Sequence, residues 1–108
     1  METMRFSVQI EFTLRVPEAA YLAHAESVLP AMRALPGLQS KVWIMSEDGR
    51  RAGGLYVFRD AASARAYVEG PIVAGLRASP NMADVSVRVS RVLESLTTAT
   101  NAPAQVRA

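Results

Sequence analysis

Only one side chain in this sequence combines an ordinary pKa near neutrality with the ability to accept and release a proton, and that is the single histidine, His24. A histidine of this kind is the natural general base for removing the proton of a phenol. His24 also lies beside the apolar stripe of a predicted helix, where a solvent-facing or partly buried structural histidine is the commoner case. We therefore predict His24 as a catalytic candidate and keep the structural interpretation open.

Three aromatic residues fall in two neighbouring strand-like segments, and their types suit the binding of a flat ligand. Trp43, the only tryptophan, would wall a pocket if it faced the helices, or fill the gap between sheet and helices as a core residue. The hydroxyl of Tyr56 could donate to a substrate oxygen, or could bond a backbone carbonyl at the rim. Phe58 shares the face of Tyr56, so we predict Tyr56 as catalytic and Trp43 and Phe58 as substrate-binding.

The same two segments contain charged and glycine positions that invite a structural explanation. Lys41 and Glu47 bracket the first segment, and a strand-end salt bridge or a turn contact is the favoured interpretation. Gly53-Gly54 predicts a bulge or a close approach of two backbones. An anion cradle is disfavoured at these glycines because no helix N-terminus follows them directly.

Composition excludes several classes of function. The sequence has 108 residues and a formal net charge of +2, with basic residues scattered singly apart from Arg50-Arg51, so no nucleic-acid surface is predicted. With no cysteine and one histidine, no metal site of several such ligands can form within one chain. The N-terminal segment alternates and does not resemble a signal peptide, and no apolar run could span a membrane, so we expect a cytoplasmic protein.

Hydrophobic periodicity predicts six main elements. Apolar and polar residues alternate in the first strand, the apolar period then becomes helical with Pro30 predicted to kink the helix, and Asp60 is a predicted helix N-cap. An Asp-Gly turn joins the second and third strands. In chain order the predictions are a strand over 6–14, a helix over 17–35, strands over 38–46 and 53–58, a helix over 61–68 resuming over 72–76, and a strand from 85 to 90 or as far as 93.

The order βαββαβ predicts a ferredoxin-like α+β fold, an antiparallel four-stranded sheet with both helices on one face. The other face carries polar but sparsely charged residues on the first and last strands, among them Glu11 and Arg88, which could pair across or within sheets. A solvated sheet face usually carries more charge. A second copy of the chain covering this face is therefore expected.

With these motifs in place, the sequence resembles the YdhR-type monooxygenase family of the dimeric α+β barrel superfamily. The resemblance covers roughly positions 36 to 67. The residues that carry it are Pro36-Gly37, Lys41-Val42-Trp43, Ser46-Glu47, Ala52-Gly53-Gly54, Tyr56, Phe58, Asp60, Ser63-Ala64 and Tyr67.

The resemblance implies a homodimer in which two sheets form a barrel, and we expect this domain to span residues 1–96. Because the sequence from Thr97 onward is rich in Thr and Ala and has no period, residues 97–108 are expected to be a flexible or partner-draped tail. It implies a monooxygenase that needs no metal, flavin or other cofactor and acts on a small aromatic or enolisable compound, with Tyr67 added to the substrate-binding residues. Two alternatives remain: a non-catalytic small-molecule-binding or dimeric scaffold domain, and a haem-degrading oxygenase with His24 as the only possible histidine ligand.

Overall fold

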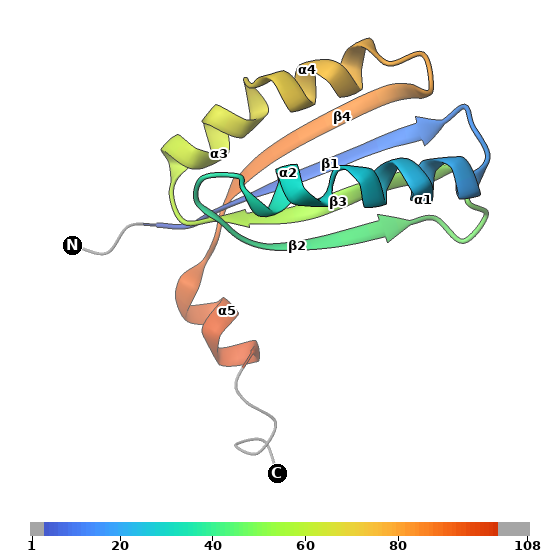
Figure 1. Ribbon diagram of the computed structural model, residues 1–108. Coiled ribbons are helices and arrows are strands. Elements are labelled where there is room, and N and C mark those ends of the chain that lie inside the picture. Colours follow the sequence, from blue (N-terminus) through green and yellow to red (C-terminus); the bar gives the residue numbers. More distant parts are fainter. Residues whose placement is uncertain (1–3, 102–108) are drawn as a thin grey trace.

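The computed structural model describes residues 4–101, which form one sheet with helices packed on one of its faces (Figure 1). Each predicted strand is present, and the predicted ferredoxin-like α+β class is confirmed. The elements are β1 (Phe6–Leu14), α1 (Glu18–Ser27), α2 (Leu29–Arg33), β2 (Leu38–Met45), β3 (Arg51–Phe58), α3 (Ala61–Val68), α4 (Pro71–Ala78), β4 (Met82–Arg91) and α5 (Glu94–Thr100).

The sheet has the strand order β2-β3-β1-β4, and all neighbouring strands are antiparallel. Strand β3 was predicted to be central because both of its faces are apolar, and the structure confirms this. Opposite Gly54 of β3 lie Ile10 of β1 on one side and Trp43 of β2 on the other. Ile10 and Trp43 therefore lie on either side of a glycine, which leaves space on the sheet between them.

The helices divide the covered face of the sheet between them. Figure 1 shows α1 and α2 lying over the β2–β3 side, while α3 and α4 lie over the β1–β4 side. Beneath them the alternating residues of β1 and β3 point inward, as the period of two predicts. The buried core residues are Val8, Ile10, Phe12, Tyr21, Met32, Ala52, Tyr56, Phe58, Ala64, Tyr67, Val73 and Met82.

Local sequence signals explain where the helices begin and end. The helix predicted over 17–35 is interrupted at Val28, and Pro30 lies in the first turn of the second piece, where its missing N–H costs nothing. Asp60 caps α3 as predicted, because its side chain accepts a hydrogen bond of 2.8 Å from the backbone N–H of Ser63. Gly70 precedes α4, which starts at Pro71.

The hairpin between β2 and β3 closes with the predicted Asp-Gly turn. Asp48 accepts hydrogen bonds from the Ser46 hydroxyl at 2.7 Å and from the Arg50 backbone at 3.0 Å. Gly49 has a φ of 73°, a left-handed conformation that glycine adopts without a steric penalty. Gly53 and Gly54 show no register shift, so the predicted bulge is absent, and the predicted close backbone approach applies at Gly53, which lies against the backbone of Ile10.

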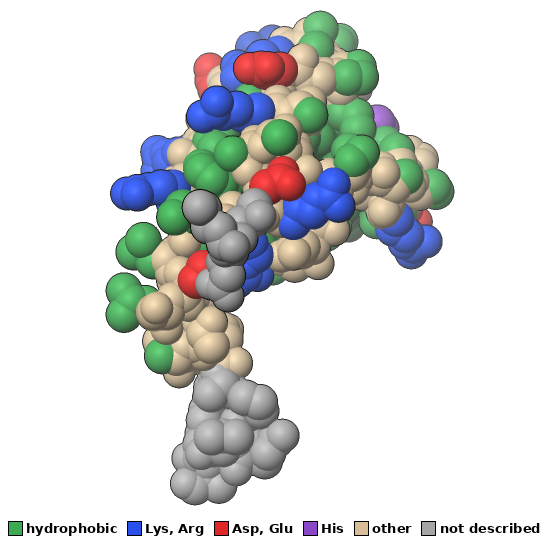
Figure 2. Space-filling model, turned by 90° about the vertical axis from the view of Figure 1, so that its left-hand side faces the viewer, with side chains coloured by type: hydrophobic (Ala, Val, Ile, Leu, Met, Phe, Trp, Pro, Cys, Tyr) green, Lys and Arg blue, Asp and Glu red, His purple; other side chains and the backbone are tan. Residues whose placement is uncertain are grey.

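The segment after β4 differs from the sequence-based expectation. Periodicity gives no regular structure from Thr97 onward, yet α5 extends to Thr100. An ion pair of 2.7 Å between Arg5 and Glu94 anchors its first turn to the start of β1. The segment projects from the body (Figure 2). The side chains of Leu93, just before α5, and of Leu96 within it are exposed. The rest of the predicted tail, 102–108, lies outside the described residues.

The face of the sheet away from the helices is part polar and part apolar. Glu11 accepts a hydrogen bond of 2.9 Å from Gln9, its neighbour on the same face, in place of the predicted pair with Arg88 within the sheet. On β2 and β3, Val42 and Leu55 lie opposite each other and are 56% and 40% exposed. Among residues 4–101, no helix has the length and apolar character needed to cross a bilayer.

Substituting Gly53 by alanine tests the close approach of β3 to β1. A Cβ atom at this position would overlap the backbone carbonyl oxygen of Ile10, which cannot move without breaking the sheet. We expect Gly53→Ala to lower the free energy of unfolding by about 3 kcal/mol, measured by urea denaturation. Gly75→Ala is the matched control, because a Cβ there meets nothing within 4 Å and α4 should gain up to about 1 kcal/mol. Equal stability of the two variants would contradict the packing described.

Candidate functional site

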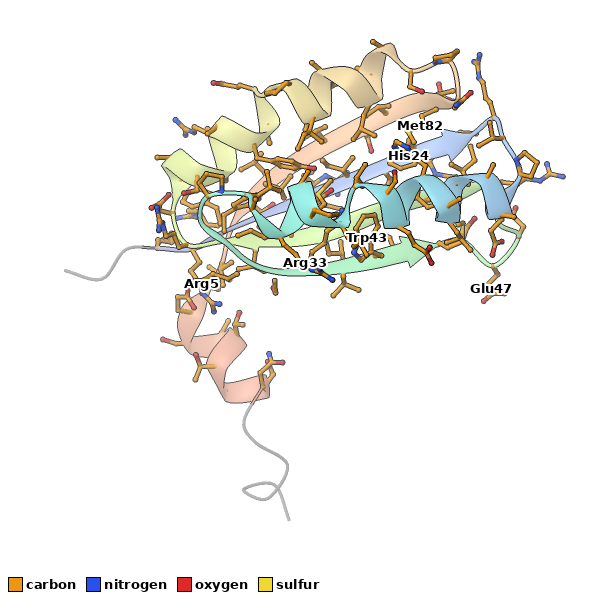
Figure 3. All side chains as sticks on the ribbon, viewed as in Figure 1. Arg5, His24, Arg33, Trp43, Glu47 and Met82 are labelled. Atoms are coloured by element: carbon orange, nitrogen blue, oxygen red, sulfur yellow. The ribbon has the colours of Figure 1, made fainter. Side chains whose placement is uncertain are left out.

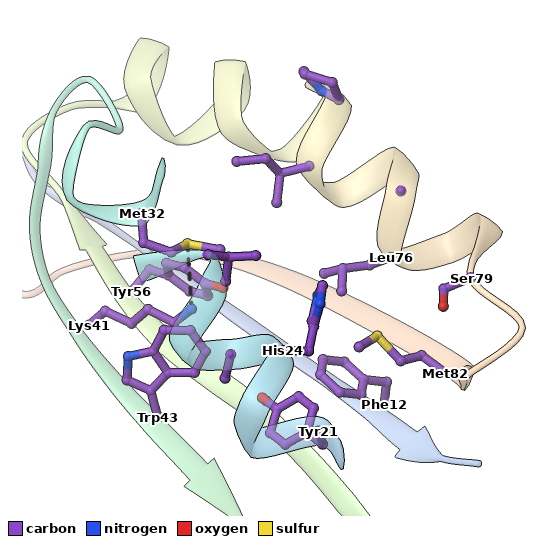
Figure 4. A pocket seen from close by; sticks show the side chains of 16 residues that line it. Phe12, Tyr21, His24, Met32, Lys41, Trp43, Tyr56, Leu76, Ser79 and Met82 are labelled. Carbon is purple, nitrogen blue, oxygen red and sulfur yellow. Dashed lines mark hydrogen bonds between the residues drawn. The ribbon is translucent and has the colours of Figure 1, made fainter. Parts of the chain in front are cut away.

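A pocket of roughly 380 Å³ lies between the two groups of helices, with the sheet as its floor (Figure 4). Residues of α1, α2 and α4 form its walls, and residues of all four strands form its floor. Most of the lining is apolar, and no carboxylate belongs to it. The lining residues are Phe12, Tyr21, His24, Ala25, Val28, Met32, Lys41, Trp43, Gly53, Tyr56, Pro71, Ile72, Gly75, Leu76, Ser79 and Met82.

Trp43 faces the helices and forms a wall of this pocket. Of its two predicted positions, pocket wall or core filler, the structure has the first. Its side chain remains 38% exposed because β2 is an edge strand. On its other side, Trp43 also lines a groove of roughly 340 Å³ between α1 and β2. The indole therefore separates the pocket from a more open surface and is not a filled core position.

Lys41 lies two residues before Trp43 on β2 and points into the same pocket. Its Nζ atom lies 3.2 Å from the centre of the Trp43 ring and 4.5 Å from the centre of the Tyr56 ring, and it donates to the Met32 sulfur at 3.6 Å. The interpretation of Lys41 as a strand-end salt bridge or turn contact is therefore wrong. Glu47, its supposed counterpart, is exposed at the tip of the hairpin (Figure 3).

The surroundings of Lys41 change its protonation equilibrium. Burial lowers the pKa of Lys41 to about 8, because removal from water disfavours the charged form. The two aromatic faces attract the ammonium, an interaction worth about 0.5–2 kcal/mol at a partly exposed site. The side chain is thus mostly a cation at pH 7, and the cation and the neutral amine are both well populated around pH 8.

Gly54 makes room for this arrangement. A Cβ atom at Gly54 would lie 2.8 Å from Cε of Lys41 and 3.0 Å from Cε1 of Tyr56, both closer than ordinary contacts. The second glycine of the pair is thus required by the lysine and the tyrosine that pack over it. The Ala-Gly-Gly motif serves the site as well as the sheet.

Tyr56 forms the back of the pocket and is almost completely buried. Its hydroxyl accepts a hydrogen bond of 2.9 Å from the hydroxyl of Tyr67 on α3, whereas the alternative predicted for it was donation to a backbone carbonyl. Burial, followed by the nearby Tyr67 hydroxyl, raises the pKa of Tyr56, and burial raises that of Tyr67. Both phenols are therefore neutral at physiological pH, and the Tyr56 proton remains available for a further acceptor.

Phe58 and Tyr67 lie behind Tyr56 and not on the large pocket. Phe58 is fully buried and stacks on Tyr56 at 6.2 Å between ring centres. Both Phe58 and Tyr67 line a separate pocket of roughly 210 Å³ beside α3. The structure thus brings His24, Trp43 and Tyr56 together in the large pocket and places the other two predicted site residues in the layer that supports Tyr56.

His24 lies at the end of the pocket opposite Lys41. It extends from α1 toward Leu76, close to Phe12 and Met82, and its side chain is exposed (Figure 4). The imidazole can therefore exchange protons with solvent and still reach a ligand in the pocket. Across residues 4–101, no three His, Cys, Asp or Glu side chains are grouped so that they could hold a metal ion.

Lys41 is the functional candidate that sequence reasoning missed. The signal was present, because residues 41 and 43 share one face of a strand, so a tryptophan that faces the helices brings Lys41 with it. Opposite them, a glycine and a tyrosine lie on β3. A lysine on the helix-covered face of a sheet needs a partner or a ligand, so its position there indicates a binding site. Interpreting Lys41 as half of a salt bridge at the strand end overlooked this indication.

The fold and the site together define this chain as a small ferredoxin-like α+β protein with an apolar pocket between its sheet and its helices. The sequence profile of the family described as "Putative mono-oxygenase ydhR" matches residues 8–103, and the chain belongs to this family. No protein with a curated description matches the sequence.

Several solved structures share the fold. NE2512, a protein of unknown function from Nitrosomonas europaea, is 20% identical, with a TM-score of 0.70 over 86% of this chain and 93% of that one. SnoaB, a cofactor-independent oxygenase from Streptomyces nogalater, is 14% identical, with a TM-score of 0.67 over 87% and 98%. MhuD, a haem degrader from Mycobacterium tuberculosis, is 20% identical, with a TM-score of 0.52 over 81% and 95%.

The protonation of Lys41 can be measured directly, because it is the only lysine in the sequence. Protein labelled with ¹³C-lysine should give a single side-chain Cε signal that titrates with a midpoint of about 8, compared with the usual 10.5. The midpoint is low because the ammonium is buried. A midpoint at the usual value would place Nζ in solvent and contradict the geometry.

The same shift predicts how stability depends on pH. Because the unfolded lysine titrates at 10.5 and the folded one at about 8, the unfolded chain binds more protons between these values. The contribution of Lys41 to the free energy of unfolding should therefore increase as pH rises from about 8 to 10.5. Lys41→Met lacks this contribution and is the control in thermal melts. Above pH 10 the three buried tyrosines act in the opposite direction, because the unfolded tyrosines lose their protons while the folded ones, whose pKa values are raised, keep them.

Proposed function

We propose that this protein is a cofactor-independent monooxygenase that acts on a small aromatic or enolisable compound. The observation that supports it best is the apolar pocket in which Trp43, Tyr56 and His24 lie on different walls. Such a pocket suits a flat ring, and few polar groups are present to orient it. Membership of the YdhR family and the fold shared with SnoaB add support.

In the proposed reaction, His24 removes a proton from an activated carbon or hydroxyl of the substrate. The resulting carbanion reacts with oxygen at carbon. For a methylene carbon, the balance is R₂CH₂ + O₂ → R₂C=O + H₂O, so one oxygen atom enters the substrate and the other leaves as water. The substrate supplies all four electrons. The apolar pocket keeps bulk water from the oxygenated intermediate.

Tyr56 would stabilise negative charge on the substrate oxygen. Its hydroxyl already accepts from Tyr67, so its own proton is free to be donated. Its raised pKa keeps that proton in place while charge develops. Trp43 would bind the ring of the substrate, and Phe58 and Tyr67, the other two residues predicted to bind it, would support the substrate site from behind Tyr56.

Two other functions compete with this proposal. A non-catalytic small-molecule-binding or scaffold domain could use the same pocket without turnover. A haem-degrading oxygenase would use His24, which is exposed at the pocket and could approach a haem iron, and the fold shared with MhuD makes this alternative worth testing.

Oxygen uptake in the presence of anthrone-type and dihydroxy-aromatic compounds tests the proposed reaction. We expect uptake with at least one such compound, a reduction of about 10²-fold or more in His24→Gln, and a similar loss in Tyr56→Phe. Arg33→Gln is the matched control, since Arg33 lies on α2 outside the pocket and should leave the rate unchanged.

Two results would overturn this assignment. Uptake that is unaffected in both His24→Gln and Tyr56→Phe would exclude the proposed roles. A shift of the Soret band on haem titration, lost in His24→Gln and accompanied by haem breakdown with oxygen, would favour the haem-degrading alternative.

The proposal includes a homodimer in which the exposed sheet faces of two chains form a barrel. The exposed pair Val42 and Leu55 gives this face an apolar half, which suits contact with another sheet. The projecting α5 segment, with Leu93 and Leu96 exposed, would be draped over the partner. A cytoplasmic location remains a prediction.

Sedimentation tests the dimer. We expect twice the chain mass of 11.7 kDa at micromolar concentration, and the mass of one chain for Val42→Asp, because a charge would be buried in the proposed interface. Arg65→Asp on α3, away from this face, is the control and should stay dimeric. A wild-type mass of one chain would contradict the barrel.

A further inference from the structure

The ammonium group of Lys41 has no anionic partner, although it lies inside a pocket. It has three N–H donors, and among the described residues its one hydrogen bond goes to the Met32 sulfur, a weak acceptor. The remaining contacts are with the ring faces of Trp43 and Tyr56. Lys41 is partly buried, and a lysine whose ammonium is withdrawn from water in a folded protein is normally paired with a carboxylate. Here that partner is missing from the lining of the pocket.

The titratable groups that face Lys41 do not supply the missing charge. Tyr56 on β3 is held neutral by burial, and Tyr67 on α3 lies behind it. Tyr21 and His24 face the pocket from α1, while β1 and α4 contribute no charged side chain to the lining. Near neutral pH the end of the pocket around Lys41 is therefore positive and lined by aromatic rings.

The residues around Lys41 have the sizes and positions needed to hold its side chain inside the pocket. Gly54 is the position that leaves space for the Lys41 stem, and a methyl group there would collide with it. Trp43, opposite Gly54 in the register, covers the ammonium at 3.2 Å. Residues of β2, β3 and α2 thus hold the cation inside a pocket whose lining contains no carboxylate.

We propose that Lys41 is the anion-binding residue of this pocket, and that the ligand is a planar aromatic compound with one negatively charged oxygen beside its ring. The oxygen accepts a hydrogen bond from the Lys41 ammonium, and the ring lies along the apolar lining next to Trp43. Phenolate, enolate and carboxylate oxygens share this chemistry. This inference rests on the proposed function in that it names the charge of the substrate for the same pocket.

Anion binding fits the protonation state of Lys41 better than proton abstraction by Lys41 does. A general base would need the neutral amine, and a pKa of about 8 leaves most of the group protonated at pH 7. Anion binding uses the protonated form and raises the pKa of Lys41. His24, at the other end of the pocket, remains free to accept the substrate proton (Figure 4).

Calorimetric titration with 2-naphthoate, in the absence of oxygen so that no turnover occurs, tests the proposal. We expect 2-naphthoate to bind the wild-type protein, and Lys41→Met to weaken that binding by about ten- to a hundredfold. Naphthalene-2-methanol has the same ring system without the charge, so its affinity for the two proteins should differ little. Lys41→Arg should restore part of the affinity for 2-naphthoate, since the charge is retained.

The pH profile gives a readout that a structural role for Lys41 would not change. Affinity of the wild type for 2-naphthoate should fall as pH rises through about 8, whereas Lys41→Arg should show no such fall. His24→Gln should retain the fall, which assigns it to the lysine. In ¹³C-lysine-labelled wild-type protein, 2-naphthoate should move the Cε titration midpoint above 8.

These measurements separate the inference from the proposed reaction. Absence of 2-naphthoate binding to the wild type, or equal affinities for wild type and Lys41→Met in correctly folded protein, overturns the role of Lys41. Lys41-dependent binding together with absent oxygen uptake supports the anion site and counts against the monooxygenase. Oxygen uptake that is unaffected in Lys41→Met overturns the inference and leaves the reaction standing.

Discussion

The alternation of side chains along the central strands β1 and β3 is the constraint on which the rest of the structure depends. On one face it directs Val8, Ile10, Tyr56 and Phe58 into the core, each at most 3% exposed. A register slip of one residue would turn these side chains to the opposite face and remove both the core and the back of the pocket. Because one face carries both, stability and the shape of the pocket are set by the same strand pairing.

The pocket exists because packing between the two helical groups is incomplete at one place. Protein interiors are normally filled, so a space of this size requires small residues where the walls face each other. Ala25 on α1 and Gly75 on α4 are such residues, and a methyl group at Gly75 would meet nothing within 4 Å. The space continues to the Lys41 ammonium, where Gly54 provides the second small position. Small residues thus define the pocket as much as the aromatic ones do.

Much of the fold could be predicted because its signals lie in short stretches of sequence. The period of two over β1, the break near Pro30 and the cap at Asp60 each depend on a few neighbouring residues. The face of the sheet on which Lys41 lies was harder to predict, because Val42, Trp43 and Ile44 are all apolar and show no alternation. Only the register against β3 decides it. The Tyr56–Tyr67 hydrogen bond likewise depends on how α3 is oriented above the sheet.

Within the proposed reaction, the two ends of the pocket have different electrostatic tasks. The neutral Tyr56 hydroxyl and the Lys41 ammonium are donors at one end, and neither has a strong acceptor in the described part of the pocket. The imidazole of His24 lies at the other end, where it is open to solvent. A substrate lying between them would have negative charge stabilised at the buried end while its proton leaves from the exposed end. Placing the cation inside and the base outside favours ionisation of the ligand without exposing the resulting anion to water.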